Sequence, residues 1–159
     1  MKKFELTAEF VTTVFGKKLF RIKALVAFGN VEKGELGGFI EKEDNLSHDG
    51  NAWVSGDAWV YGNAQVSGNA RVSGNAWVSG NADYAVVTGF GRFFRTTTFF
   101  RCKDKILRVQ CGCFYGDLAQ FREIVKKTHG NSKYAKEYLA IADLMELHFS
   151  DEEENQEAD

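Results

Sequence analysis

The chain has 159 residues, of which 44% are hydrophobic and 26% are charged, a balance typical of one globular domain with a small annex. No run of about 18 apolar residues is present, and residues 1–9 carry charge too early for a secretory signal, so the sequence predicts neither a membrane span nor export. Three cysteines without an export signal indicate free thiols in a reducing cytoplasm. Proline is absent and glycine is abundant, which excludes collagen-like and proline-rich linker architectures.

The formal net charge of −2 hides an uneven distribution. Residues 151–159 hold six acidic residues and no basic residue, and we expect them to form a solvated, disordered tail. Residues 86–111 hold six lysines and arginines against a single acidic residue, Asp104. The sequence therefore combines a basic middle segment with an acidic end.

The first predicted unit is an N-terminal β cap over residues 1–33. Within it, residues 10–26 have the pattern of a β-hairpin: residues 10–15 are rich in β-formers, Gly16 to Lys18 form the turn, and residues 19–24 alternate apolar with basic side chains. We expect this unit to be structural and to carry no chemistry.

Residues 34–85 form the second predicted unit, and most of it is an internal repeat. From Val54 onward the sequence follows the pattern V-x-G-[ND]-A-x in five consecutive six-residue units. A period of six matches neither a helix nor a long alternating strand, but it matches a short strand followed by a tight turn. Glycine with Asn or Asp tolerates the positive φ of such a turn, and the small Ala suits a narrow interior.

This pattern resembles the hexapeptide-repeat family, whose fold is a left-handed parallel β-helix with three six-residue units in each coil. The resemblance implies that residues 18 apart stack about 4.8 Å from each other. The inner pairs would be Val54 with Val72, Val60 with Val78, and Val66 with Tyr84. The outer pairs would be Trp59 with Trp77, and Trp53 with Arg71 in a cation–π contact.

Outward tryptophans on so short a solenoid predict an interaction surface. We expect Trp53, Trp59 and Trp77 to form an oligomer interface, and the family resemblance favours a homotrimer. The alternative is that other segments of the same chain cover these side chains.

Residues 86–150 are predicted to be a C-terminal α+β region. Residues 93–102 and 106–111 have the pattern of a β-hairpin. Asp117 with Gln120 forms a capping box that starts a helix ending at Gly130, and a second helix follows over about 132–149. The predicted fold class is thus mainly β: a short left-handed parallel β-helix capped by an N-terminal hairpin and by a C-terminal hairpin plus two α-helices.

The whole layout resembles a group of hexapeptide-repeat proteins encoded in bacteriophage and prophage genomes. The resemblance covers most of residues 19–148 and implies a fold and a phage context but no chemistry. Besides the repeats, it is carried by residues 20–25, 33–40 and 43–47, by Gly112-Cys113-Phe114, and by Gly116, Phe121, His129-Gly130 and Tyr138.

Two kinds of chemistry are weighed and set aside. Many hexapeptide-repeat proteins are acyltransferases, which need a general base that is usually a histidine. The chain has only three histidines, His48, His129 and His148. Its solenoid is also shorter than such enzymes require and lacks a long loop excursion between units. Cys111-x-Cys113 is not a common zinc spacing, and in a strand both thiols would pack on one face. We therefore expect no catalytic residue, no metal and no cofactor.

The basic, aromatic segment is the strongest functional signal. Arginine offers paired donors to phosphate, and phenylalanine offers a stacking surface for a base. The alternative is a plain sheet with its phenylalanines inward and its arginines solvated. Arg92 and Arg95 would bind phosphate, Phe93 or Phe114 would stack on a base, and Thr96 and His129 would add polar contacts.

These signals lead to a functional hypothesis. The chain is expected to be a non-enzymatic, oligomeric protein in the cytoplasm of an infected bacterium that sequesters a small nucleotide-derived, phosphate-bearing defence signal. The segment is too weakly charged for nucleic acid, and no membrane partner is expected. The alternatives are an inhibitor or scaffold that binds a host protein through the Trp59–Trp77 face or the acidic tail, and an acyltransferase-like enzyme.

Overall fold

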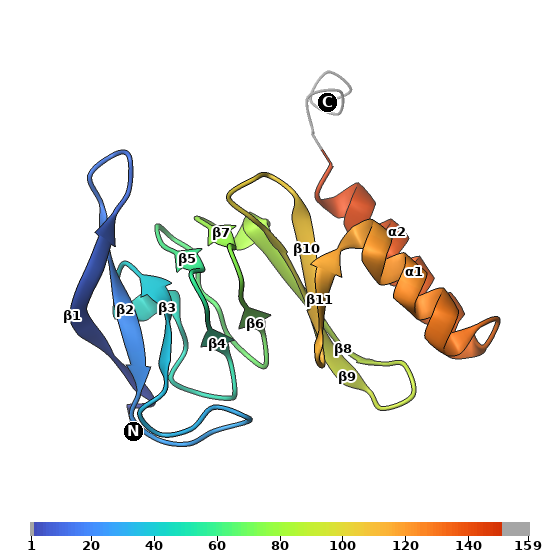
Figure 1. Ribbon diagram of the computed structural model, residues 1–159, viewed down its shortest axis with the longest axis horizontal. Coiled ribbons are helices and arrows are strands. Elements are labelled where there is room, and N and C mark those ends of the chain that lie inside the picture. The colour runs from blue at the N-terminus through green and yellow to red at the C-terminus, as the bar shows by residue number, and fades with distance from the viewer. Residues whose placement is uncertain (1, 151–159) are drawn as a thin grey trace.

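The computed structural model describes residues 2–150 of the chain. It is an elongated mixed α/β molecule, 39% strand, with the repeat toward one end and two helices at the other (Figure 1). The acidic tail predicted over residues 151–159 lies outside the described residues.

The predicted N-terminal hairpin is present but its strands are shifted. β1 (Phe4–Thr12) pairs antiparallel with β2 (Lys18–Ala24), so the first strand starts six residues earlier than expected. The turn is closed by the Thr13 N–H, which donates to the Lys17 carbonyl. The prediction that Val14 and Phe15 end a strand is wrong, because both lie in this turn and are 94% and 93% exposed.

The repeat forms very short parallel strands in the predicted register. β3 (Leu36–Ile40), β5 (Trp59–Val60) and β7 (Trp77–Val78) pair side by side, as do β4 (Trp53–Val54) and β6 (Arg71–Val72). The 18-residue stacking of Val54 on Val72, Val60 on Val78 and Trp59 on Trp77 is confirmed.

The third side of the repeat is less regular. It holds an isolated bridge between Leu46 and Val66, and no closed solenoid is detected within residues 2–150. The predicted ladder pairing of Val66 with Tyr84 is wrong, because after the short 3-10 turn Asn81–Asp83 the Tyr84 backbone pairs with Phe100, although its side chain packs against the core of the repeat.

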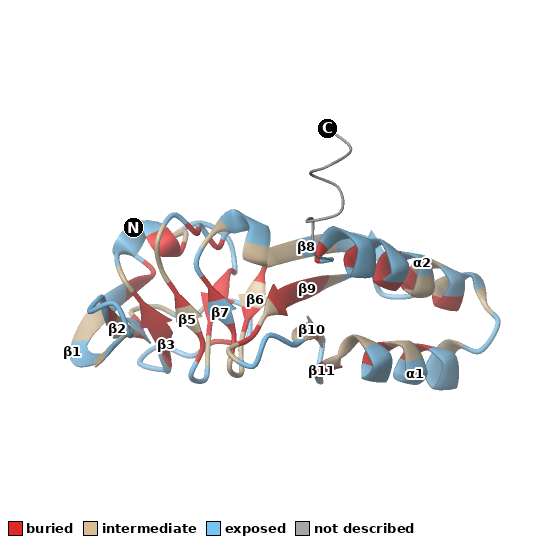
Figure 2. Ribbon diagram, turned by 90° about the horizontal axis from the view of Figure 1, so that it is seen from above, coloured by how far each residue is buried: buried red, intermediate tan, exposed pale blue. Residues whose placement is uncertain are grey.

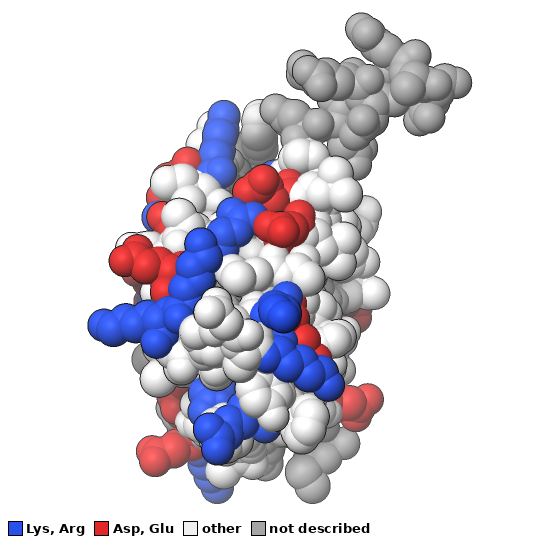
Figure 3. Space-filling model, turned by 90° about the vertical axis from the view of Figure 1, so that its right-hand side faces the viewer, with Lys and Arg blue, Asp and Glu red and all other residues white. Residues whose placement is uncertain are grey.

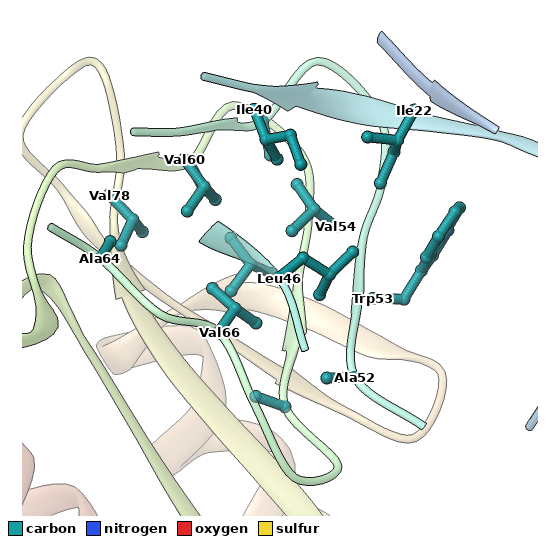
Figure 4. Packing of buried hydrophobic residues seen from close by; sticks show 14 of the residues in the cluster. Ile22, Ile40, Leu46, Ala52, Trp53, Val54, Val60, Ala64, Val66 and Val78 are labelled. Atoms are coloured by element: carbon teal, nitrogen blue, oxygen red, sulfur yellow. The ribbon is translucent and has the colours of Figure 1, made fainter. Parts of the chain in front are cut away.

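The interior of the repeat is lined by small and branched side chains. The alanines at residues 52, 58, 64, 70 and 76 are at most 1% exposed, whereas Ala82 in the last unit is exposed, and the valines point toward one another from different strands (Figure 4). Gly56 and Gly74 adopt a φ of 63° in their turns, which favours glycine there, whereas Gly80 of the last unit is extended with a φ of −161°. Figure 2 shows these buried strands inside a largely exposed outline of turns.

Trp53 belongs to this interior, contrary to its predicted place on an outer face. Its side chain is 1% exposed and its ring lies 5.3 Å from that of Phe28. Arg71 pairs with Trp53 in register, but its guanidinium donates to Asn30 and makes no cation–π contact with Trp53 among the described residues. The cause is that the segment before β3 folds over Trp53, which removes it from the surface.

A buried lysine joins β1 to the repeat. The Lys3 ammonium donates to the Ala52 carbonyl at 2.7 Å and lies over the Phe28 ring, 4.6 Å from its centroid. A second polar group, Asn45 at the end of the 3-10 turn Glu43–Asn45, donates to the Ala64 carbonyl at 2.9 Å. Both side chains satisfy backbone groups of the repeat that would otherwise be buried without partners.

The C-terminal region holds more sheet than the predicted single hairpin. β8 (Tyr84–Phe90), β9 (Arg95–Arg101), β10 (Leu107–Cys111) and β11 (Phe114–Asp117) form an antiparallel sheet in the order β11-β10-β9-β8. The predicted hairpin is the centre of a four-stranded sheet, because the segments flanking it, including the strand expected at 84–88, pair with its outer edges. With 39% strand and two C-terminal helices the fold is mixed α/β, which corrects the prediction of a mainly β fold.

Both predicted helices are confirmed. α1 (Leu118–His129) starts with the Asp117–Gln120 capping box and ends at Gly130, whose φ is 59°. α2 (Lys133–His148) starts at Ser132, whose hydroxyl accepts from the Ala135 N–H. The helices pack on the sheet around a second hydrophobic core that includes Phe99, Phe121 and Tyr138. The sheet also touches the repeat, because the Lys103 N–H donates to the Asn75 carbonyl at 3.0 Å.

Candidate functional site

A cavity of about 270 Å³, which we call the aromatic cavity, lies where the C-terminal sheet meets the two helices. The turn between β8 and β9 and the turn between β10 and β11 form one side of it, and α1 and α2 contribute the other. Its lining combines three basic side chains, four aromatic rings, two thiols, two aliphatic side chains and a hydroxyl: Arg92, Phe93, Arg95, Cys111, Cys113, Phe114, Phe121, Ile124, Val125, Thr128, His129 and Tyr138.

The basic side of the aromatic cavity is the β8–β9 turn. Phe93 is 68% exposed, and the guanidinium carbons of Arg92 and Arg95 lie 5.9 Å and 5.5 Å from its ring centroid. Both contacts are within cation–π range, so two cations lie close to one exposed aromatic ring.

The turn is fastened to α2 by two hydrogen bonds. The Gly91 N–H donates to Glu137 at 3.1 Å, and the Tyr138 hydroxyl donates to the Phe90 carbonyl at 3.3 Å. A Cβ at Gly91 would collide with the Tyr138 hydroxyl, so the close approach of turn and helix requires glycine.

The opposite wall of the cavity is built from aromatic rings. The Phe121 ring lies 5.8 Å from both Phe114 and Tyr138, and the His129 imidazole stacks on Tyr138 at 5.8 Å with an interplanar angle of 26°. Burial, with a smaller contribution from the charge of Cys111, raises the pKa of Tyr138 to about 12. The phenol therefore stays protonated near neutral pH and acts as a hydrogen-bond donor.

The ion pairs of the chain single out the arginines near this cavity. Of the seven arginines, Arg21, Arg101, Arg108 and Arg122 are within 4 Å of a carboxylate. Across residues 2–150, Arg71, Arg92 and Arg95 have no such partner. Figure 3 shows the helical end of the molecule, where Lys and Arg side chains run across the middle of the face. Unpaired guanidinium groups are free to meet an anion from solution.

The sequence-predicted residues fall into two neighbouring places. Five of them, Arg92, Phe93, Arg95, Phe114 and His129, line the aromatic cavity. Thr96 lines instead an adjacent cavity of about 360 Å³, which we call the polar cavity and which shares Arg95 with the first. Whether these residues bind a ligand stays a prediction.

Sequence reasoning missed several residues of both cavities. Tyr138 and Thr128 come from the helices, and Arg71 and Asn30 come from the repeat and from the segment before β3. Arg71 alone carried a usable signal, since it is a cation at the outward position of a repeat that elsewhere places Trp, Gln or Asp there.

The two outward tryptophans pair as expected. The rings of Trp59 and Trp77 are 6.4 Å apart in an edge contact, and the Lys103 ammonium lies 4.2 Å from the Trp59 ring. Trp77 is 39% exposed, and its indole N–H donates to the Tyr61 hydroxyl. The open part of this face is therefore centred on Trp77.

His48 and two of the cysteines have structural contacts, and His148 lies edge-on to Phe149 with ring centroids 4.9 Å apart. The Lys3 N–H donates to His48 Nδ1 at 3.0 Å, and the imidazole stacks on Phe4 at 4.1 Å. Burial raises the pKa of the Cys102 thiol, and Cys111 accepts from the Thr97 hydroxyl at 3.2 Å. Within residues 2–150 no three His, Cys, Asp or Glu side chains are grouped to hold a metal. None of the described helices has the length and apolarity to cross a membrane.

Comparison with known proteins identifies the repeat. Residues 64–82 match the family model described as the YdcK beta solenoid repeat. The matched segment includes β6 and β7, so the comparison supports a solenoid repeat in the part of the chain where the parallel strands stack. No curated protein matches the chain significantly.

Proposed function

We propose that this chain is a non-enzymatic binding protein for a small nucleotide-derived ligand, with the base in the aromatic cavity and a phosphate between Arg92 and Arg95. The single observation that carries the proposal is a cavity walled by Phe114 and Phe121 whose basic side holds two guanidinium groups without carboxylate partners among residues 2–150. Stacking and paired N–H donors are the two interactions that a nucleotide needs.

The size of the cavity favours a small molecule. Its volume of about 270 Å³ is near the lower end of the ~300–1,000 Å³ typical of small-molecule sites, which is enough for a base but not for a stacked strand. His129 and the Tyr138 hydroxyl add polar groups that would orient the ring.

Three further parts of the proposal concern the whole protein. The repeat would close into a left-handed parallel β-helix, and copies would associate as a trimer through the face centred on Trp77, whose large aromatic side chain is 39% exposed. By the phage resemblance, the protein would act in the cytoplasm of an infected bacterium as a sponge for a defence signal. The exposed Trp77 face equally suits a host-protein inhibitor, which is the second candidate function.

The test is native mass spectrometry of the purified protein with a pool of cyclic dinucleotides, ADP-ribose derivatives and acetyl-coenzyme A, followed by calorimetric titration of any ligand retained. We expect an unaltered nucleotide bound once per subunit in an oligomer. Arg92→Ala and Arg95→Ala should each weaken binding about 10-fold or more, because each removes a charge-assisted contact.

Arg122→Ala is the matched control, because it removes the same charge from a side chain that Asp143 and Glu146 already neutralise at 2.9 Å. Its affinity should equal that of the wild type. An oligomer that retains no ligand would overturn the proposal in favour of a protein-binding role, and turnover of acetyl-coenzyme A would favour the enzyme.

A further inference from the structure

The polar cavity beside the aromatic cavity has the composition of an anion site. Its lining consists of two guanidinium groups, two amides, a hydroxyl and a glycine: Arg71, Arg95, Asn30, Gln110, Thr96 and Gly112. Among these lining residues there is no carboxylate and no large apolar side chain. Guanidinium, amide and hydroxyl donors together are suited to the oxygens of a phosphate group.

The polar groups of this cavity are held in place by the surrounding fold. The Arg71 N–H donates to the Thr98 hydroxyl at 3.0 Å, which fixes its backbone against β9, while its guanidinium donates to Asn30. The Gln110 amide N–H donates to the Gly112 carbonyl at 2.8 Å, and its Oε1 accepts from Ser73 at 2.8 Å. Such pre-arranged donors lose little freedom when an anion binds.

Arg71 has an environment that an anion would improve. It is half-buried, and burial lowers the pKa of its guanidinium, while the charge of Glu35 partly opposes that shift. A guanidinium that is partly removed from water and lacks a carboxylate within 4 Å among the described residues is costly. A bound phosphate would supply a direct countercharge, which Glu35 supplies only from beyond 4 Å.

Arg95 lies at the boundary of the two cavities and lines both. We infer that the polar cavity is a second anion subsite, and that the ligand carries two phosphate groups with Arg95 between them. The assignment of two phosphate groups to one ligand rests on the proposed function. It places the base and the first phosphate in the aromatic cavity and the second phosphate at Arg71. The ligand class is therefore a nucleoside diphosphate or a dinucleotide rather than a nucleoside monophosphate.

Calorimetric titrations at constant ionic strength test this inference with AMP, ADP and inorganic pyrophosphate. We expect the wild type to bind ADP about 10-fold more tightly than AMP and to bind pyrophosphate measurably. Arg71→Gln should remove the preference for ADP and the pyrophosphate binding, with AMP affinity unchanged. Thr96→Val, a nearly isosteric change, should reduce the same preference in part.

Arg122→Gln is the matched control and should keep the preference for ADP and the affinity for pyrophosphate. Thermal unfolding of each variant establishes that it is folded. If Arg71→Gln does not fold, the preference for ADP measured in Thr96→Val provides the test. Equal wild-type affinities for AMP and ADP with no pyrophosphate binding would overturn the inference and leave the proposed function standing. Pyrophosphate binding that depends on Arg71, without any binding of AMP or ADP, would support the anion subsite and overturn the base site.

Discussion

Gly112 and Arg95 lie against each other at the boundary of the two cavities. Gly112 has a φ of 58°, and a Cβ at this position would collide with Nη1 of Arg95. The glycine therefore both allows the turn between β10 and β11 and leaves the space in which the guanidinium lies.

Gly112→Ala should move the Arg95 guanidinium and weaken ligand binding about 10-fold, as loss of one charge-assisted contact would. It should also lower the free energy of unfolding by about 1 kcal/mol, because alanine is strained at positive φ. Gly68→Ala is the control: Gly68 has a φ of 66° and nothing within 4 Å of the added Cβ. Urea unfolding and calorimetry on both variants separate the two effects, and equal affinities would show that Arg95 is not positioned by Gly112.

At the scale of elements, α2 holds the β8–β9 turn that carries Arg92 and Phe93. The Gly91 N–H has Glu137 as its acceptor, and Arg92 and Phe93 follow directly along the chain. A turn that lost this acceptor would open more often without unfolding the sheet or the helix.

Glu137→Ala should speed amide hydrogen exchange at residues 91–94 and weaken ligand binding several-fold, while the free energy of unfolding falls by about 1 kcal/mol or less. Glu123→Ala removes an equally charged, exposed side chain from α1 and should change neither quantity. Hydrogen exchange measured by mass spectrometry at peptide resolution is sufficient to detect the faster exchange at residues 91–94. Unchanged exchange in Glu137→Ala would mean that Tyr138 alone fastens the turn.

The elements that sequence reasoning found are those with local signals. The repeat has its period, and both helices have caps at residues 117, 130 and 132. The sheet was incompletely predicted because strand pairing is decided by distant partners: β8 and β11 complete the sheet only once β9 and β10 are in place. Phe93 and Phe94 have strand-forming side chains but lie in a turn, where Phe94 adopts a φ of 55°.

The same division holds for the candidate site. Arg92, Phe93 and Arg95 could be named because they are close together in the sequence and share a chemistry. Tyr138 could not, and Arg71 could be noticed only as an unusual outward cation of the repeat, since both come near Arg95 only through the contact of the sheet with the repeat and with α2.

At the scale of the whole molecule, Lys3 makes global stability depend on pH. Lys3 is only 3% exposed. Burial lowers the pKa of its ammonium group from 10.5 to about 8, and the charge of Asp49 partly opposes this shift. Below about pH 8 both the folded and the unfolded chain hold the proton, so folding bears the full cost of burying the charge. Between about pH 8 and 10.5 only the unfolded chain keeps it, so the free energy of unfolding contributed by Lys3 rises with pH.

Urea unfolding of the wild type and of Lys3→Met at two pH values, about 7.5 and about 9.5, checks this sign. Other groups titrate in both proteins, so the informative quantity is the difference between them. We expect the wild type to gain stability relative to Lys3→Met on going to the higher pH. A constant difference between the two proteins would mean that the Lys3 ammonium keeps an ordinary pKa in the folded state.

The ladder of the repeat has a consequence for how such a protein can change in length. Strands in this ladder pair 18 residues apart, as Trp59 with Trp77 and Val54 with Val72 do. A duplicated block of 18 residues would therefore give every side chain the same kind of neighbour it had before. The hairpin end and the cavity end would move apart by one strand spacing, about 4.8 Å, with neither altered. The repeat can thus serve as a spacer whose length is set in whole steps, independently of the chemistry at the far end.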